Sequence, residues 1–280
     1  MKTEIEAHGK INLALDVLYK RDDGYHEIKS VMQQISLSDT LIIEDDTKGV
    51  KIECDSPYVP SDGTNLVYKA WKEISKIAGT NAGIRVRIIK RIPVAAGLAG
   101  GSADGAAVIA ALNDMWELGM TKIEMMEIGL KIGADLPFCL LGGTALAEGV
   151  GEKLTELKTL SGVHVLLAAP GIQISTADTY SKLRLRDQRL PVDEMVLAIE
   201  RGEIKGVTEN LSNVLEEVIF PENPKIAELK NLMTKFGAMG SLMSGSGSSV
   251  FGIFEDEDKL NFAYTKFRKL QINVIKTATV

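Results

Sequence analysis

The chain has 280 residues, of which 45% are hydrophobic and 25% charged, and it carries a formal net charge of −6. This length and composition indicate a globular protein with a full core, more naturally read as two domains than one, and the acidic balance excludes a broad nucleic-acid surface. Because it has neither a hydrophobic signal core nor an apolar run approaching the ~20 residues of a membrane span, we expect a cytoplasmic protein without a membrane partner.

The N-terminal half is rich in predicted strands. From Lys10 to Leu18 the residues alternate, which places apolar side chains on one face and Lys10 and Asn12 on the other. A lysine on such a face is more often solvated than functional. The turn Asp22-Asp-Gly-Tyr-His-Glu27 follows and by itself indicates only a hairpin. Further strands are expected at residues 26–37, 40–45 and 50–54.

A predicted helix at residues 65–78 and a strand at 84–90 lead to a loop rich in small residues. It reads Arg91-Ile-Pro-Val-Ala-Ala-Gly-Leu-Ala-Gly-Gly-Ser-Ala-Asp-Gly-Ala-Ala107 and enters a helix predicted from Ser102 to Trp116. Glycines let the backbone approach an anion, and the first helical turn offers unpaired N–H donors. The stretch therefore predicts a phosphate site, although it matches neither a Walker A nor a Rossmann pattern. Lys10, Lys20, Arg21, Lys90 and Arg91 are the candidates for local positive charge.

The next elements surround a single carboxylate. Thr121-Lys-Ile-Glu124 is a capping box that opens a helix to about Lys131. Asp135 follows in an apolar turn, and a strand is expected at residues 138–148. An aspartate at such a turn is usually a cap or an Asx turn. The lack of polar neighbours around Asp135 still favours a functional reading.

The rest of the chain predicts a second α+β domain. We place its boundary in the polar stretch at 153–162, giving domains 1–157 and 158–280. A second glycine/serine loop, Met243-Ser-Gly-Ser-Gly-Ser-Ser249, lies between two short strands. Cys54 and Cys139 lack zinc-ligand spacing and are expected to be buried, reduced thiols. Helices are predicted at 175–183, 192–201, 203–218, 224–236 and 256–268, and strands at 163–169, 240–244, 250–254 and 272–279.

Taken together, four motifs resemble the GHMP small-molecule kinases. They are Pro-x-x-x-Gly-Leu-Ala-Gly-Gly-Ser at 93–102, Lys-Ile-Asn-Leu at 10–13, Gly-Ala-Asp at 133–135 and Ser-Gly-Ser-Gly at 244–247. The resemblance covers essentially the whole chain. It implies a two-domain α+β fold with an N-terminal domain like ribosomal protein S5 domain 2, a ferredoxin-like C-terminal domain and an active site in the cleft between them.

The segment Asp23-Gly-Tyr-His-Glu27 narrows the resemblance to members that act on a cytidyl-diphosphate sugar alcohol. The implied reaction transfers the γ-phosphoryl of ATP, with Mg²⁺, to the 2-hydroxyl of 4-diphosphocytidyl-2-C-methyl-D-erythritol in the non-mevalonate isoprenoid pathway. Two alternatives stay open. One is a related kinase acting on homoserine or mevalonate, and the other is a non-catalytic nucleotide-binding regulator of the same fold. For the oligomeric state we expect a monomer or a weak homodimer.

The resemblance also assigns roles to residues. Asp135 accepts the proton of the hydroxyl, Lys10 lies beside it, and Asn12 binds the hydroxyl or a phosphate oxygen. Tyr25 and Tyr180 stack on the cytosine and His26 binds its polar edge. The role of Tyr180 rests on a weaker match to the family pattern than the role of Tyr25. The phosphates of ATP are expected on Pro93, Val94, Ala95, Ala96, Gly97, Leu98, Ala99, Gly100, Gly101, Ser102 and Ala103.

Three residues need a separate comment. Ser102 is a candidate for contacting the metal. Ala103 stands where the family commonly has serine, which removes one hydroxyl from the loop. Asp16 is a further candidate for lining the site.

Overall fold

The structure is a computed structural model that describes residues 1–80 and 82–280. The chain divides into two compact units, each assembled from stretches that are far apart in sequence. The first unit comprises residues 1–9, 37–94 and 99–142, and the second comprises 10–36, 95–98 and 143–280. The predicted domain boundary between residues 157 and 158 stays a prediction.

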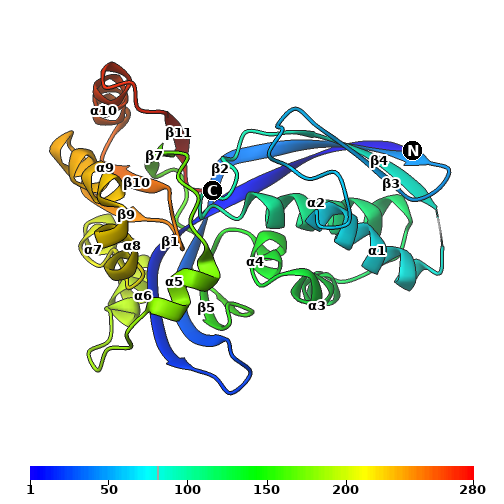
Figure 1. The fold of residues 1–280 in the computed structure, drawn as a ribbon, viewed down its shortest axis with the longest axis horizontal. Helices are drawn as coiled ribbons and strands as arrows, with labels where there is room; N and C mark the ends of the chain where they lie inside the picture. The colour runs from blue at the N-terminus through cyan, green and yellow to red at the C-terminus, as the bar shows by residue number, and fades with distance from the viewer. Residues whose placement is uncertain (81) are drawn as a thin grey trace. The chain divides into compact units, whose positions relative to one another are not determined.

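Two long strands contribute to both units, β1 (Lys2–Lys20) and β2 (His26–Asp46) (Figure 1). Sequence alternation predicts only part of β1 and divides β2 in two. The predicted break at residues 38 and 39 is absorbed into one extended strand, because Asp39 is fully buried there and bonded rather than placed in a turn.

The first unit packs helices on one face of a sheet (Figure 1). Its strands run in the order β3-β4-β2-β1, with β4 antiparallel to β2 and β3 parallel to β4. Alternate residues of β4, including Val86 and Ile88, are fully buried against α1 and α2. The other elements of this unit are β3 (Val50–Cys54), α1 (Leu66–Ala78), β4 (Gly83–Ile89), α2 (Gly100–Met115), α3 (Lys122–Ile132) and α4 (Leu136–Leu141).

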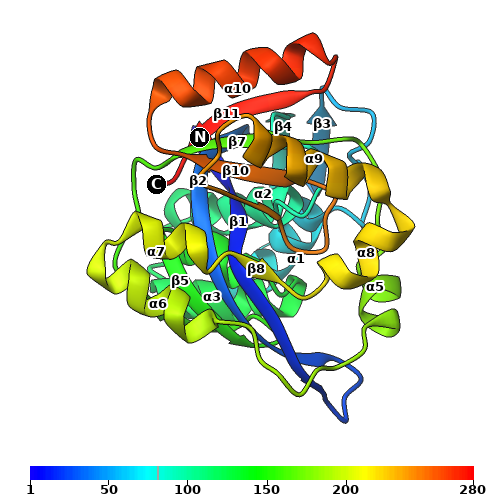
Figure 2. The same cartoon turned by 90° about the vertical axis from the view of Figure 1, so that its left-hand side faces the viewer.

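The second unit contains a four-stranded antiparallel sheet in the order β11-β7-β10-β9. The helices α9 and α10 cover one face of it (Figure 2). In the same unit, β2 pairs with β5 and β1 pairs with β8. The bounds are β5 (Thr144–Gly149), β6 (Lys153–Glu156), β7 (His164–Ala168), α5 (Thr176–Lys182), α6 (Val192–Arg201), α7 (Ile204–Glu209), β8 (Ser212–Asn213), α8 (Glu216–Glu222), α9 (Pro224–Lys235), β9 (Gly240–Met243), β10 (Val250–Phe254), α10 (Glu257–Lys269) and β11 (Val274–Ala278).

The strand predicted at residues 138–148 is wrong in its first half. Residues 136–141 form the short helix α4, and only from Thr144 onward does the chain form β5. A short apolar run fits a buried strand and a buried helix equally well, so its periodicity cannot decide. Pro137 in the first turn favours the helix, and Gly142, with φ of 79°, ends it.

The single helix predicted at residues 203–218 is also wrong. Two short helices, α7 and α8, are separated by β8, which pairs in parallel with β1 so that Ser212 lies opposite Ala14. The side chain of Asn213 bonds backbone groups here, which is how asparagine competes with helix formation. Within the described residues Cys54 and Cys139 form no disulfide, and both are half-buried rather than buried as predicted.

Candidate active site

The predicted phosphate loop, residues 93–103, joins β4 to α2. Ala95, Gly97 and Ala99 all have positive φ, at 53°, 75° and 55°. Ala99 is the N-cap of α2, and within the described chain no side chain caps it. The first four N–H groups of a helix, counted from the N-cap, have no partner inside it, so those of residues 100–102 after the N-cap Ala99 point out of the helix start. This backbone can bind an anion.

Ser102 and Ala103, the two residues at the end of this loop, differ in what they can offer a phosphate. Ser102 is half-buried in the first turn of α2 and Gly101 beside it is exposed. Ala103 is buried in the core of the first unit, and its N–H already donates to the carbonyl of Ala99 at 2.9 Å. Ala103 therefore offers neither a hydroxyl nor a free donor, and the proposed phosphate contacts end at Ser102.

The second glycine/serine loop packs directly on residues 95–98 of the phosphate loop. Ser244 Oγ donates to the carbonyl of Gly97 at 2.9 Å, and the N–H of Ser249 donates to the carbonyl of Ala96 at 3.2 Å. A Cβ added to Gly97 would lie 2.2 Å from the Ser244 carbonyl oxygen. The two loops, whose contacting residues Gly97 and Ser244 are 147 positions apart in sequence, thus form one backbone surface in the second unit.

Lys10 and Asn12 lie beside these loops. The N–H of Lys10 donates to the carbonyl of Leu98 at 3.1 Å, and Lys10 Nζ donates to Asn12 Oδ1 at 2.6 Å. A Cβ built on Gly245 would lie 3.5 Å from Lys10 Nζ and 3.3 Å from Asn12 Oδ1. Three of the four motifs therefore meet within the second unit.

The interpretation of Lys10 as a solvated side chain is wrong. Lys10 and Asn12 are only 5% and 2% exposed, because both faces of β1 are covered here. Asn12 is held in turn, since its Nδ2 donates to Ser30 Oγ at 2.9 Å and Ser30 donates to the carbonyl of Ala14 at 2.6 Å. A buried ammonium held by a hydrogen-bonded amide is a costly arrangement, which is typical of a functional group.

Asp135 lies in the first unit at the start of α4. It is the N-cap residue and half-buried, but among the described residues its side chain makes no capping hydrogen bond. The capping explanation for this aspartate is therefore not supported by its geometry. Lys10 belongs to the other unit, and the expected approach of Lys10 to Asp135 stays a prediction.

The residues expected to bind the cytosine are grouped in the second unit. The rings of His26 and Tyr180 lie 5.2 Å apart between centroids at an angle of 41°. Tyr180 comes from α5 and is half-buried, whereas Tyr25 is 65% exposed on the turn that opens β2. Burial, with a smaller effect of Lys20, lowers the pKa of His26, which favours the neutral ring at pH 7. A tilted pair and an exposed tyrosine provide two aromatic surfaces.

Three charged candidates have structural partners instead. Asp16 is buried, and its two oxygens accept the N–H groups of Val17 at 2.9 Å and Leu190 at 3.2 Å, which fixes a loop rather than lining a site. Arg21 pairs with Glu27 at 2.8 Å. Lys90 is paired with two buried carboxylates and so does not supply free positive charge.

Asn213 is a site residue that sequence reasoning missed. Its Nδ2 donates to the carbonyls of Met243 and Gly245, both at 2.8 Å, and its Oδ1 accepts the N–H of Leu215 at 3.0 Å. It thereby braces the second glycine/serine loop from β8. The only available signal was an asparagine inside a predicted helix, where asparagine is unfavourable.

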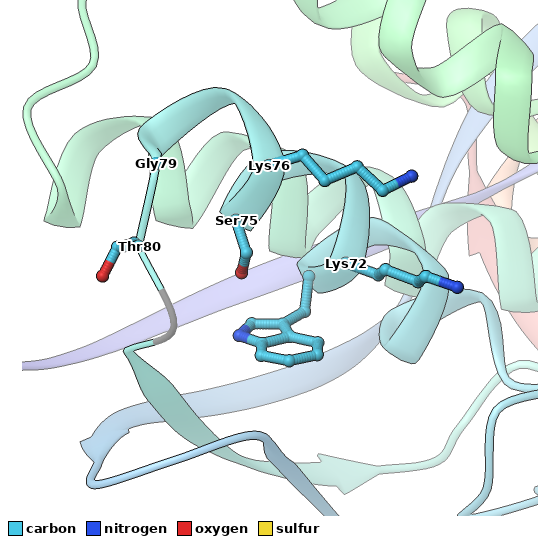
Figure 3. A pocket seen from close by; sticks show the side chains of 6 residues that line it. Lys72, Ser75, Lys76, Gly79 and Thr80 are labelled. Carbon is cyan, nitrogen blue, oxygen red and sulfur yellow. The ribbon is translucent and has the colours of Figure 1, made fainter.

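A separate hollow of about 350 Å³ lies along α1 (Figure 3). Ser75 points its buried hydroxyl inward, while Lys72 and Lys76 extend from the helix. The lining residues are Trp71, Lys72, Ser75, Lys76, Gly79 and Thr80, and the predicted site residues lie elsewhere in the chain. We assign this hollow no role in the site.

Among the described residues there is neither a metal-ligand cluster nor a membrane-spanning helix. Within residues 1–80 and 82–280, His, Cys, Asp and Glu side chains form no group of three or more that could hold a metal ion. Every helix in the same part of the chain is too short or too polar to cross a bilayer.

Comparison with known proteins identifies the family. Residues 65–143 match the model of the GHMP kinases N-terminal domain, and residues 195–273 match that of the GHMP kinases C-terminal domain. The chain is 45% identical over 278 residues to 4-diphosphocytidyl-2-C-methyl-D-erythritol kinase of Acetivibrio thermocellus, covering 99% of this chain and 98% of the relative. It is 46% identical over 266 residues to the Bacillus cytotoxicus protein of the same name, covering 94% and 92%.

Solved structures agree with the fold. A crystal structure of 4-(cytidine 5'-diphospho)-2C-methyl-D-erythritol kinase has a TM-score of 0.85 at 34% identity and covers 99% of both chains. Homoserine kinase from Cytophaga hutchinsonii has a TM-score of 0.80 at 18% identity, covers 100% of this chain and 94% of its own, and shows the fold alone. The predicted two-domain fold of mixed α and β content is thus confirmed, and the chain belongs to the GHMP kinase family.

Proposed function

We propose that this chain transfers the γ-phosphoryl group of ATP to the 2-hydroxyl of 4-diphosphocytidyl-2-C-methyl-D-erythritol. The observation that carries the proposal is the meeting of Lys10 and Asn12 with residues 95–98 and 244–249 in one unit. Phosphoryl transfer needs mainly alignment and neutralisation of charge, and this cluster offers an ammonium group beside a backbone that can bind anions. The names of the full-length relatives support the choice of acceptor.

The donor half of the site is the phosphate loop. We expect the N–H groups of residues 100–102 and the loop from Pro93 to Ala99 to bind the ATP phosphates, assisted by the dipole of α2. Mg²⁺ typically keeps several waters and is held by substrate phosphates with one or two protein groups. The half-buried hydroxyl of Ser102 is the protein group that fits this role in the first helical turn. When bound, the ion neutralises charge on the phosphates.

The acceptor half needs a base and a positive charge. We propose that Asp135 orients the hydroxyl and accepts its proton. We propose that the Lys10 ammonium stabilises the charge that develops on the transferring group, with Asn12 fixing its position through the 2.6 Å hydrogen bond. Burial strengthens both effects because the local dielectric is low.

The cytosine is expected between the aromatic side chains of the second unit. Tyr25 offers an exposed ring that a base can cover, and the tilted His26–Tyr180 pair offers a second surface. A neutral His26 both donates and accepts hydrogen bonds, as reading the polar edge of cytosine requires.

Both substrates of the proposed reaction are polar nucleotides, so we place the reaction in the cytoplasm. We propose separately that the enzyme acts as a monomer or weak homodimer.

A phosphorylation assay tests this function against its alternatives. Equal concentrations of 4-diphosphocytidyl-2-C-methyl-D-erythritol, homoserine and mevalonate are each incubated with the full chain and Mg·ATP, and ADP release is followed. We expect kcat/KM for the cytidyl compound to exceed the other two by at least a thousandfold. Preference for homoserine or mevalonate would replace the proposed acceptor, and ATP binding without turnover of any of the three would favour the regulator.

A further inference from the structure

A buried ion triad lies beside both ends of the phosphate loop in the first unit. Lys90 Nζ lies 2.5 Å from Asp39 Oδ2 and 2.8 Å from Asp104 Oδ2. The three side chains are only 6%, 0% and 4% exposed. One ammonium is thus shared between two carboxylates away from water.

The triad holds the entrance of the loop. Lys90 follows the last residue of β4, and Asp39 comes from β2. Asp39 Oδ1 accepts the backbone N–H groups of Arg91 at 2.6 Å and Ile92 at 2.9 Å. The backbone that enters the loop is therefore fixed by a carboxylate that is itself fixed by Lys90.

The same lysine holds the exit of the loop. Asp104 lies in the second turn of α2, the helix whose start forms the anion-binding end of the loop. A Cβ added to Gly100 would lie 3.1 Å from Lys90 Nζ and 2.9 Å from Ile92 Cγ2. The first residue of α2 thus lies against both the Lys90 ammonium and the side chain of Ile92 at the entrance of the loop.

The cost of this arrangement indicates that it serves more than stability. Buried ion pairs contribute little net stability compared with apolar side chains of similar size, because desolvation offsets their attraction. Here, among the described residues, Asp104 Oδ1 has no hydrogen-bond partner. Burial and the Asp39 carboxylate raise the pKa of Asp104 to about 7 against the charge of Lys90.

We propose that Lys90, Asp39 and Asp104 are positioning residues that fix the separation of the two ends of the phosphate loop and thereby set the affinity for ATP. The inference rests on the proposed binding of ATP phosphates at this loop. None of the three need touch the nucleotide, because their effect is transmitted by the N–H groups of residues 91 and 92 and by the start of α2.

The test compares two isosteric variants with a matched control. Asp104→Asn and Asp39→Asn each keep the side chain's size and remove one carboxylate from Lys90. Asp46→Asn is the control, because Asp46 pairs with Lys51 at 2.8 Å in the same unit but far from the loop in sequence. Affinities for a non-hydrolysable ATP analogue with Mg²⁺ and for cytidine diphosphate are measured by titration calorimetry on the full chain, with folding checked by circular dichroism.

We expect Asp104→Asn to weaken binding of the ATP analogue more than threefold and binding of cytidine diphosphate less than twofold, with Asp46→Asn unchanged. Weakening of less than threefold, or equal weakening for both ligands, would overturn the proposal. If Asp104→Asn does not fold, Asp39→Asn decides by the same criteria. A wild-type chain that fails in the phosphorylation assay while Asp104→Asn selectively loses the ATP analogue would refute the proposed function and leave this inference standing.

Discussion

Gly97 gives the sharpest test of how the two glycine-rich loops fit together. A left-handed conformation alone does not require glycine here, since Ala95 and Ala99 adopt it with φ of 53° and 55°. What excludes a larger residue at Gly97 is the carbonyl oxygen of Ser244, which would lie 2.2 Å from an added Cβ. Because that oxygen belongs to the backbone, relief requires one loop to move.

The substitution Gly97→Ala carries two separable costs. The left-handed conformation costs a Cβ-bearing residue about 1–2 kcal/mol, and forcing a methyl group into a packed site adds about 1–3 kcal/mol. Gly162→Ala isolates the first cost, because Gly162 lies in the same unit with φ of 77° and its Cβ would meet nothing within 4 Å. We expect losses in unfolding free energy of about 2–5 kcal/mol for Gly97→Ala and about 1–2 kcal/mol for Gly162→Ala.

The unfolding free energy of both variants is measured by urea unfolding followed by far-ultraviolet circular dichroism. Tryptophan fluorescence would not serve, because Trp71 and Trp116 both lie in the first unit and would report on that unit alone. Displacement of the loop should also weaken ATP binding at least tenfold in Gly97→Ala and leave it unchanged in Gly162→Ala. If Gly97→Ala costs no more than Gly162→Ala, the packing of Ser244 against the phosphate loop does not exist as described.

Four further predictions concern chemistry and pH. Asp135→Asn should leave ATP affinity within twofold while kcat falls by about 10²–10⁴, the usual effect of losing a general base; more than a tenth of wild-type kcat in the ADP-release assay would remove Asp135 from that role. Tyr25→Ala should raise KM for the cytidyl substrate roughly tenfold through a lost stacking contact of about 1–3 kcal/mol, with KM for ATP unchanged, and a parallel rise in both would contradict a cytosine platform. Because burial lowers the pKa of His26, its contribution to stability is present above the unfolded value of 6.5 and is lost as pH falls and the ring is protonated. A protonated ring cannot accept a hydrogen bond from cytosine, so cytidine diphosphate should bind more weakly at pH 5.5 than at pH 8 in wild type but not in His26→Gln. The pKa of Asp104 is instead raised to about 7, so its contribution is present at low pH and declines as pH rises from about 4 to 7; unfolding at pH 5.5 and 7.5 should show about 2 kcal/mol less decline in Asp104→Asn than in wild type, and identical declines would argue against the raised value.

Much of this protein was predictable because its signals are local. The capping box at Thr121 and Glu124 depends on residues three apart, and both of its hydrogen bonds are present. The small-residue loop before α2 follows from what glycine permits near residue 97 and from the unpaired donors of a helix start. One failure occurred where the local pattern is ambiguous, at 136–141, where a run equally compatible with strand or helix folds as a helix. Another occurred where distant residues decide, at Ser212 and Asn213, which pair with β1 inside a predicted helix.

The sequence by itself determined the family, the mixed α and β content and the identity of the chemical groups, because motif spacing and turn chemistry are written in neighbouring residues. Only the tertiary structure decided which groups meet. It buries Lys10 with Asn12 beside Gly245, pairs His26 with Tyr180, and converts Lys90 from a source of free charge into the centre of an ion triad. Burial and pairing depend on what covers a strand's second face, and alternation along one strand carries no information about that cover.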